Sequence, residues 1–256
     1  MAVSYNTHHV VRFSSGEVWC FSYSHNQEII IREMGSNGIW KLPYELIFDV
    51  HEDFSVEIDN NDHLHLMCRS RKGELLYLSY NGADWSKQVI SVFEPALYTI
   101  RYPVVIPANN QIHVLFAVGK AFNTGYWSLQ HYCLDNSEWN ATEVTKITSG
   151  YRLSPFYTDV SDKYIHLAYR SLAANKYQIF YCKYHMDHNI WSSPENVTND
   201  DNDCNMPSIL VRDDILHLAW ISLHKNDLSV KYKNRSVRST GKNEWSSEIH
   251  LNSQGT

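Results

Sequence analysis

The chain repeats one pattern five times from end to end. Its most regular landmark is a His between two apolar residues, directly after a polar turn. The landmark occurs at Leu64-His65-Leu66, Ile112-His113-Val114, Ile165-His166-Leu167 and Leu216-His217-Leu218, and Val18-Trp19-Cys20 takes the same place near the N-terminus. The intervals counted from Trp19 are 46, 48, 53 and 51 residues. A repeat of this period predicts an array of supersecondary units that bury their apolar faces against one another.

Two further landmarks give the same count. One Trp per unit is expected to open the fourth strand, and one residue per unit, ten or eleven positions before the central landmark, is expected to begin the first strand. The tryptophans are Trp40, Trp85, Trp139, Trp191 and Trp245, and the first-strand residues are His9, Ser55, Pro103, Pro155 and Pro207. Three landmarks that agree on five copies indicate true repeats.

The unit from Ser154 to Asn199 shows what each copy contains. Two runs rich in β-branched and aromatic residues, Phe156 to Val160 and Tyr164 to Tyr169, flank a polar turn and indicate a hairpin. A third run covers Tyr177 to Tyr181, and Trp191 begins a fourth after another polar turn. Four strands in about 45 residues is the size of one propeller blade.

We therefore predict an all-β fold, a five-bladed β-propeller of four-stranded antiparallel blades that forms a single domain over residues 1–256. The blades are expected at about 4–50, 51–97, 98–149, 150–200 and 201–256. Each is contiguous in sequence, from the innermost first strand to the outermost fourth. No strand is shared to close the ring, so closure would depend on apolar packing between the first and last blades.

Charge and composition limit the partners. The net charge is 22 − 28 = −6, which disfavours nucleic acid and anionic membranes as partners. No signal peptide pattern and no run approaching 18 apolar residues are present, so a soluble, cytoplasmic protein without membrane insertion is expected. Five cysteines without CxxC spacing indicate reduced core thiols.

The fifth unit resembles the sialidase-like, or Asp-box, β-propeller repeat, and the likeness extends over essentially the whole chain. It is carried by Pro207-Ser208-Ile209, Leu216-His217-Leu218-Ala219-Trp220, Ser229-Val230-Lys231-Tyr232 and Glu244-Trp245-Ser246. The Asp-box hairpin itself is degenerate. Asp135 and Asp187 stand four residues before their Trp where the family has five, and Tyr80 replaces the Asp before Trp85.

The resemblance implies catalytic groups that this chain does not reproduce. Sialidases use three arginines, a Tyr/Glu pair and a further acid. Arg101-Tyr102-Pro103 is similar to their Arg-Ile-Pro element but falls in the third blade, so its role is not transferred. Five-bladed glycosidases, which the chain resembles in architecture, carry an acid on the innermost strand of the first blade, and residues 8–13 contain none.

Catalytic motifs give no support for an enzyme either. The chain has no Gly-x-Ser-x-Gly elbow, Walker loop or HExxH motif. Paired carboxylates on inner strands would indicate a glycosidase. The available acids Glu57, Asp59 and Asp159 are predicted at the far end of their strands, so no catalytic residues are assigned.

No metal site and no cofactor are predicted. The repeated His65, His113, His166 and His217 are expected to be spread around the ring and to bond neighbouring strands, because metal ligands must converge on one ion. His8-His9 and His63-Leu64-His65 lack a third ligand. The acidic loop 199–203 is interpreted as a solvated turn, with a calcium site as the alternative.

Binding residues are expected at one rim, where loops leading into first strands meet loops between second and third strands. Arg with Tyr is the pairing typical of recognition surfaces. The candidate ligand-binding residues are Tyr98, Arg101, Tyr102, Tyr151, Arg152, Arg69 and Arg170. The alternative is a solvated rim in which Arg69 and Arg170 anchor turns.

The predicted function is a non-catalytic module that binds a glycan-like ligand or a protein partner through this rim. Two alternatives stay open. One is a glycoside hydrolase or lyase of the five-bladed type, and the other is a pure protein-interaction scaffold. The oligomeric state is left open.

Overall fold

The fold consists of β-strands joined by turns. The structure, a computed structural model, describes residues 8–121, 125–148, 154–224, 227–238 and 244–251. Within these residues there are 21 strands and no helix. Tyr151 and Arg152 of the predicted rim lie outside the described residues.

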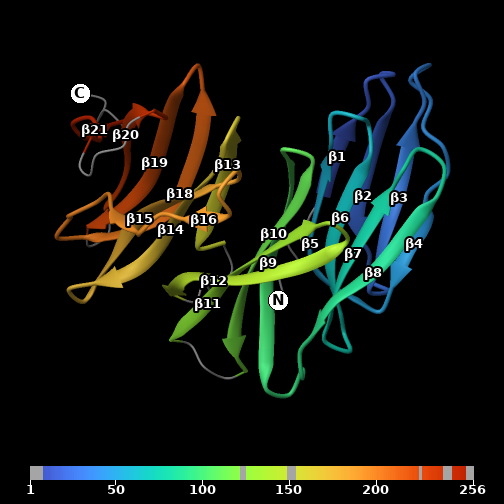
Figure 1. The fold of residues 1–256 in the computed structure, drawn as a ribbon, viewed down its shortest axis with the longest axis horizontal. Helices are drawn as coiled ribbons and strands as arrows, with labels where there is room; N and C mark the ends of the chain where they lie inside the picture. Colours follow the sequence, from blue (N-terminus) through green and yellow to red (C-terminus); the bar gives the residue numbers. More distant parts are fainter. Residues whose placement is uncertain (1–7, 122–124, 149–153, 225–226, 239–243, 252–256) are drawn as a thin grey trace. The chain divides into compact units, whose positions relative to one another are not determined.

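The strands form five antiparallel sheets, coloured in sequence order in Figure 1. The first sheet contains β1 (His8–Arg12), β2 (Val18–Tyr23), β3 (Glu28–Met34) and β4 (Tyr44–Phe48). The second contains β5 (Val50–Ile58), β6 (Leu64–Ser70), β7 (Glu74–Tyr80) and β8 (Trp85–Val92). The third contains β9 (Tyr98–Ala108), β10 (Gln111–Lys120), β11 (Tyr126–Asp135) and β12 (Glu138–Thr148).

The last two sheets have the same plan. The fourth contains β13 (Phe156–Ser161), β14 (Tyr164–Ala173) and β15 (Lys176–His185), whose outer edge pairs with both β16 (Ile190–Trp191) and β17 (Glu195–Asn196). The fifth contains β18 (Asp203–Arg212), β19 (Ile215–His224), β20 (Asp227–Ser236) and β21 (Ile249–His250). Each sheet comes from one contiguous stretch of chain, so the predicted five-bladed propeller with contiguous blades is confirmed.

Two compact units make up the chain. One comprises Met1–Asn123 with Ser128–Val144, and the other comprises Thr124–Trp127 with Thr145–Thr256. The first three sheets lie essentially in the first unit, and the last two lie in the second.

Tight turns between first and second strands follow local chemistry. Asn109 and Asn110 have φ of 50° and 58°, and Asp213 and Asp214 have φ of 52° and 60°. Two consecutive left-handed residues are typical of the hairpin turn whose twist matches that of its strands, and Asn and Asp tolerate this conformation best.

The fourth strands differ in part from the prediction. Trp85 begins β8, Trp139 is the second residue of β12 and Trp191 ends β16. Trp40, by contrast, makes only an isolated bridge to Met34, and β4 begins four residues later. The intervening Pro43 explains the interruption, because proline has no N–H for the ladder. Trp245 precedes β21 and lies outside a strand.

The core lies between neighbouring sheets of each unit. In the first unit Trp139 of the third sheet meets Tyr77 of the second edge to face, with ring centroids 5.4 Å apart. In the second unit Trp245 meets Tyr181 of the preceding sheet in the same way at 5.5 Å. The predicted role of these tryptophans in blade packing is confirmed at these two positions.

The repeated histidines bond within their own sheets. Nδ1 of His65 lies 2.7 Å from the Tyr77 hydroxyl, Nδ1 of His166 lies 2.7 Å from that of Tyr181, and Nδ1 of His217 lies 2.6 Å from that of Tyr232. In the third sheet a second imidazole replaces the phenol, and His113 Nδ1 lies 3.1 Å from His131 Nε2. The expected bond to a neighbouring strand is confirmed in all four sheets.

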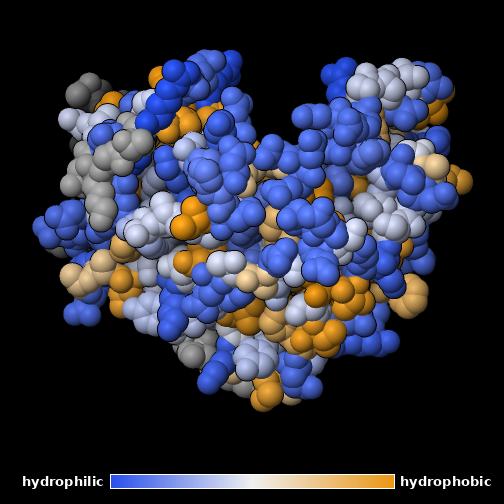
Figure 2. Space-filling view, viewed as in Figure 1, coloured by the Kyte–Doolittle hydropathy of each residue, from blue (hydrophilic) through white to orange (hydrophobic). Residues whose placement is uncertain are grey.

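The cysteines are free thiols, as predicted. Four of the five are buried and Cys20 is half-buried. On the face that Figure 2 shows, hydrophilic residues predominate and hydrophobic ones gather in small groups. Across the described residues, no helix is long and apolar enough to cross a membrane.

Candidate functional site

Two bulges in inner strands of the first unit place polar side chains at one end of adjacent sheets. The pairing of β5 with β6 shifts register between Val50 and Phe54, so His51 and Asp53 lie in a bulge. The pairing of β9 with β10 shifts between Leu115 and Ala117, opposite Tyr102, whose φ is 56°. Bulges redirect side chains and are common beside binding sites.

The end of β6 and the turn after it supply two arginines at this end of the sheets. Arg69 is the penultimate residue of β6, and Arg71 follows the strand and donates its backbone N–H to Asp49 O at 2.8 Å. The turn closes at Gly73, with φ of 89°, where a Cβ would lie 1.9 Å from the carbonyl oxygen of Phe93. Only glycine fits there, so the close approach of the β6–β7 turn to the chain after β8 depends on it.

We call His51, Asp53, Arg69, Arg71 and Arg101 the arginine cluster. A direct ion pair within it joins Arg101 Nε to Asp53 Oδ2 at 3.0 Å, between β9 and β5. The Arg101 guanidinium also lies over the Tyr102 ring, 5.8 Å from its centroid. The ion pair and the ring together restrict this guanidinium to one direction.

Burial and neighbouring positive charges lower the pKa values of two side chains in the cluster, His51 and Arg69. Burial, and after it the positive charges of Arg69, Arg71 and Arg101, lowers the pKa of His51 to about 4, so its imidazole is uncharged at neutral pH. Burial lowers the pKa of Arg69 to about 10, with Asp53 opposing this effect. Within the part of the chain that the structure describes, the buried Nε of Arg69 has no hydrogen-bond partner. A buried donor without an acceptor is costly, so this N–H is suited to an acceptor from a ligand or water.

A narrow cleft opens beside Arg69. His51, Arg71 and Tyr98 line it together with Phe93 and Ile100. Its volume of about 10 Å³ has room for one water-sized group. The Tyr98 ring, 39% exposed, packs edge to face on Phe93 at 6.5 Å. The cleft therefore admits a small polar group, while the rest of a ligand would lie outside it against the tyrosine.

The structure brings together four of the seven predicted site residues. Arg69, Tyr98, Arg101 and Tyr102 belong to this one region of the first unit. Sequence reasoning missed His51 and Asp53. They lie near the start of the first strand of the second sheet, as Tyr98 and Arg101 do in the third sheet. This equivalence between repeats was the signal that could have found them.

Arg170 belongs to the second unit and is held by that unit's own side chains. Its Nε donates to Thr148 Oγ1 at 3.1 Å and its Nη1 donates to Asn205 Oδ1 at 2.5 Å. The guanidinium also lies over the Tyr177 ring at 4.7 Å. These contacts tie β14 to β12, β18 and β15, and the ligand-binding role of Arg170 stays a prediction.

Two of the three acids considered as catalytic groups bond the backbone, and burial raises the pKa of the third, Glu57. Asp159 accepts N–H hydrogen bonds from Val160 at 2.9 Å and from Val211 at 2.5 Å. Asp59 accepts from the N–H groups of Asn61 and His63, each at 2.8 Å. These bonds fix strand ends, which is a structural task.

The acidic loop 199–203 is tied to the fold chiefly by side chains. Asp200 Oδ2 accepts from Lys231 Nζ at 2.5 Å and from Ser222 Oγ at 2.9 Å. Its Oδ1 accepts from the backbone and side-chain nitrogens of Asn202. Among the described residues, no group of three or more His, Cys, Asp or Glu side chains is arranged to hold a metal ion.

Comparison with known proteins yields similar folds only. No family model and no curated protein matches the sequence. AofleA from Arthrobotrys oligospora aligns over 96% of this chain and 72% of its own, with a TM-score of 0.56 and 14% identity. The SapL1 lectin, solved with alpha methyl fucoside, aligns over 96% and 81%, with a TM-score of 0.54 and 9% identity.

A third similar structure is an enzyme. An ulvan lyase from a new polysaccharide lyase family aligns over 90% of this chain and 66% of its own, with a TM-score of 0.57 and 9% identity. At such identities the likeness shows the propeller fold alone. Because a fold of this kind occurs in both a lectin and a lyase, function must be argued from the site.

Proposed function

We propose that this protein is a non-catalytic module that binds a glycan bearing an acidic group, through the arginine cluster. The observation that carries the proposal is the buried Nε of Arg69, which has no acceptor among the described residues and opens beside a cleft of one-water size. A carboxylate or sulfate oxygen of a sugar satisfies this donor and faces the neighbouring guanidinium groups of Arg71 and Arg101.

The aromatic side chains support a sugar ring as the rest of the ligand. Tyr98 is half-exposed beside the cleft, and Tyr102 lies under the Arg101 guanidinium. A tyrosine presents an apolar face and a hydroxyl together, which suits the C–H and O–H faces of a sugar. The similar fold of the SapL1 lectin, solved with a fucoside, is consistent with this function.

A glycoside hydrolase or lyase is the second candidate, as the similar fold of the ulvan lyase allows. The observation in its favour is the uncharged imidazole of His51 among three arginines, since such a group can accept a proton. Its pKa of about 4 makes it a weak base at neutral pH, and Asp59 and Asp159 are held by backbone N–H groups. Binding without turnover is therefore the stronger interpretation.

The test is isothermal titration of the full chain with sodium glucuronate, sodium galacturonate and glucose 6-sulfate, alongside uncharged glucose. We expect acidic sugars to bind and glucose to bind at least about tenfold more weakly at this site. Arg69→Met, which keeps the length of the aliphatic stem, is expected to lose at least about tenfold in affinity.

Arg12→Met is the matched control, because Arg12 is an exposed arginine at the end of β1 that belongs to neither candidate site. Equal loss with both variants, or no binding of any acidic sugar, contradicts the proposal. Turnover of a uronate polymer or an aryl glycoside by the natural chain, lost with His51→Gln, would favour the second candidate. Binding of a protein through the same residues in the absence of glycan would favour a scaffold.

A further inference from the structure

A second pocket lies within the second unit. It is bordered by the turn between β13 and β14, the turn between β18 and β19, and the end of β20. Its volume is about 360 Å³, which is within the range of roughly 300 to 1,000 Å³ typical of small-molecule sites. Its described lining includes none of the residues predicted from the sequence to bind a ligand.

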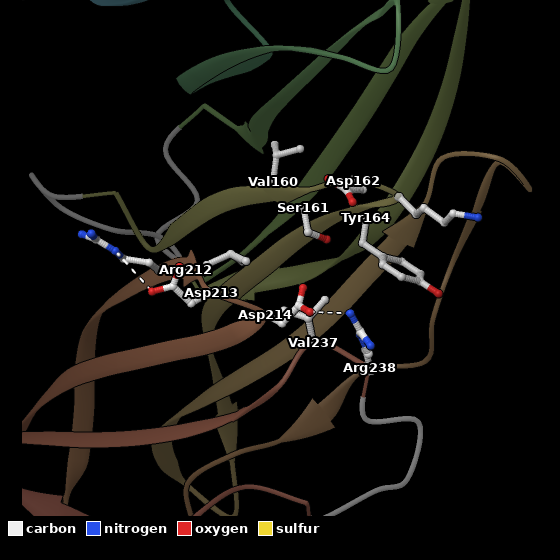
Figure 3. A pocket seen from close by; sticks show the side chains of 11 residues that line it. Val160, Ser161, Asp162, Tyr164, Arg212, Asp213, Asp214, Val237 and Arg238 are labelled. Atoms are coloured by element: carbon white, nitrogen blue, oxygen red, sulfur yellow. Dashed lines mark hydrogen bonds and ion pairs between the residues drawn. The ribbon is translucent and has the colours of Figure 1, made fainter.

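The pocket has two polar walls and apolar lining residues. Figure 3 shows Ser161 and Tyr164 on one side, with Asp214, Val237 and Arg238 facing them across the opening. Three valines contribute the apolar part of the lining: Val160, Val211 and Val237. Apolar contacts with a few fixed polar groups are the usual composition of a small-ligand site.

Charge in the pocket is balanced. Three acids and three cations line it: Asp162, Asp213 and Asp214 against Lys163, Arg212 and Arg238. Arg238 Nη2 lies 2.6 Å from Asp214 Oδ2, and Arg212 Nε lies 3.7 Å from Asp213 Oδ2. A lining of zero net charge does not select an ion, in contrast to the arginine cluster, so the ligand that fits here is neutral.

The Asp214–Arg238 pair presents an acceptor and a donor side by side. One carboxylate oxygen meets one guanidinium nitrogen, and the two side chains are 63% and 82% exposed, so a ligand can reach their other polar atoms. Two adjacent hydroxyls of one ligand match this arrangement, because one donates to the carboxylate while the other accepts from the guanidinium.

A fixed hydroxyl faces this pair from the other wall. Ser161 Oγ lies 2.9 Å from Nε2 of the buried His166, whose Nδ1 lies 2.7 Å from the Tyr181 hydroxyl. Burial lowers the pKa of His166 to about 3, so the imidazole is neutral and orients the serine without activating it as a nucleophile. The hydroxyl is therefore positioned before any ligand arrives, which lowers the cost of binding.

We propose that this pocket binds one uncharged sugar ring through a vicinal diol, as a second glycan site of different specificity from the arginine cluster. The diol bonds to the Asp214–Arg238 pair, the Ser161 hydroxyl bonds a third oxygen, and the valines contact the C–H groups of the ring. The inference does not depend on the function proposed for the arginine cluster.

The test is saturation-transfer NMR and titration of the full chain with four uncharged probes: methyl α-D-mannopyranoside, methyl α-D-glucopyranoside, methyl α-L-fucopyranoside and methyl β-D-xylopyranoside. We expect at least one to bind with a dissociation constant on the order of 1 mM, largely independent of salt concentration. Asp214→Asn and Ser161→Ala are each expected to weaken it at least about fivefold.

Asp84→Asn, which changes an exposed turn aspartate of the first unit, is the matched control, and Arg69→Met separates the two sites. Weakening by the pocket variants, with both of these unchanged, supports the proposal. Absence of binding for all four probes at about 10 mM overturns it. So does binding that Asp214→Asn and Ser161→Ala leave intact, or that Arg69→Met abolishes, and the latter result would assign the sugar to the arginine cluster.

Discussion

Arg101 on β9 and Asp53 in the bulge of β5 form an ion pair 3.0 Å long that joins the innermost strands of two adjacent sheets. Both side chains are about a quarter to a third exposed, at 30% and 23%. The pair is thus neither fully screened by solvent nor sealed inside the protein, and it holds one guanidinium of the arginine cluster in place.

Replacing Asp53 with Asn is expected to strengthen binding of acidic sugars. The change removes the carboxylate that pairs with Arg101 and frees its guanidinium for the ligand. At the effective dielectric of a partly exposed site this gives roughly a threefold to tenfold gain for glucuronate at low salt. Titration in about 20 to 300 mM salt checks it, because the gain should shrink as salt rises. A loss of affinity at every salt concentration would show that Asp53 chiefly positions Arg101.

Removing the tyrosine hydroxyl from a His–Tyr pair should lower the stability of the folded protein. Tyr77→Phe keeps the ring that packs against Trp139 and removes the partner of His65 Nδ1, which is buried. The expected loss is about 1 to 3 kcal/mol in the free energy of unfolding, measured by urea denaturation. Tyr157→Phe, at an exposed position, is the control and should change it by less than about 0.5 kcal/mol.

Buried imidazoles make stability depend on pH. Burial lowers the pKa of His113 to about 4, and those of His131 and His166 to about 3. In the unfolded chain these groups take up protons near pH 6.5, whereas in the folded chain they do not. Their contribution is therefore complete above pH 6.5 and is lost as the pH falls from there towards 4.

These three imidazoles alone should lower the free energy of unfolding by roughly 4 kcal/mol per pH unit in the lower part of that range. The pKa of His51 is also lowered by burial, so this imidazole acts in the same direction. Urea denaturation at pH 7.5, 6.5, 5.5 and 5.0 measures the decrease. A denaturation midpoint that stays constant from pH 7.5 to 5.0 would mean that these imidazoles are protonated in the folded protein.

Much of the fold could be predicted from sequence because each repeat carries the same local signals. The His landmark of the second strand and the polar turns recur in register, and a repeated signal is harder to misread than a single one. The prediction was wrong at Trp40, where Pro43 breaks the strand it was expected to open. Trp40 is itself 39% exposed, and the point at which strand pairing begins depends on the residues that follow it.

The candidate sites were less accessible to sequence reasoning. Loops from different sheets were expected to meet, and Arg69 and Tyr98 do so. His51 and Asp53 were missed because their placement depends on a bulge, which has no distinct pattern in a single sequence. The pocket beside Asp214 was also missed, because Asp213-Asp214 has the composition of an ordinary hairpin turn.

The free cysteines should differ sharply in reactivity. Cys20 is half-buried, whereas burial raises the pKa of Cys68 to about 12 and those of Cys133 and Cys204 to about 11. We expect a disulfide reagent at pH 8 to label one thiol in the folded protein and five in denaturant. Cys20→Ser should abolish the labelling of the folded protein, and labelling that persists would show that a buried thiol becomes exposed by local opening.

Tyr102 combines an unusual backbone with a predicted binding side chain, and the two can be separated. Its φ of 56° is shared by Met206, with φ of 53°, in the equivalent bulge of the fifth sheet. The backbone conformation is thus a feature of the fold, while the aromatic ring belongs to the third sheet alone.

In an ordinary strand, glycine is less stable than alanine by about 0.5 to 1 kcal/mol, but at positive φ the order should reverse. We expect Tyr102→Gly to be more stable than Tyr102→Ala by about 1 kcal/mol, and Met206→Gly and Met206→Ala to show the same order in urea denaturation. Both Tyr102 variants should weaken glucuronate binding, whereas both Met206 variants should leave it unchanged. If the Tyr102 variants retain full affinity, the ring serves only the fold and the ligand is held by the arginines.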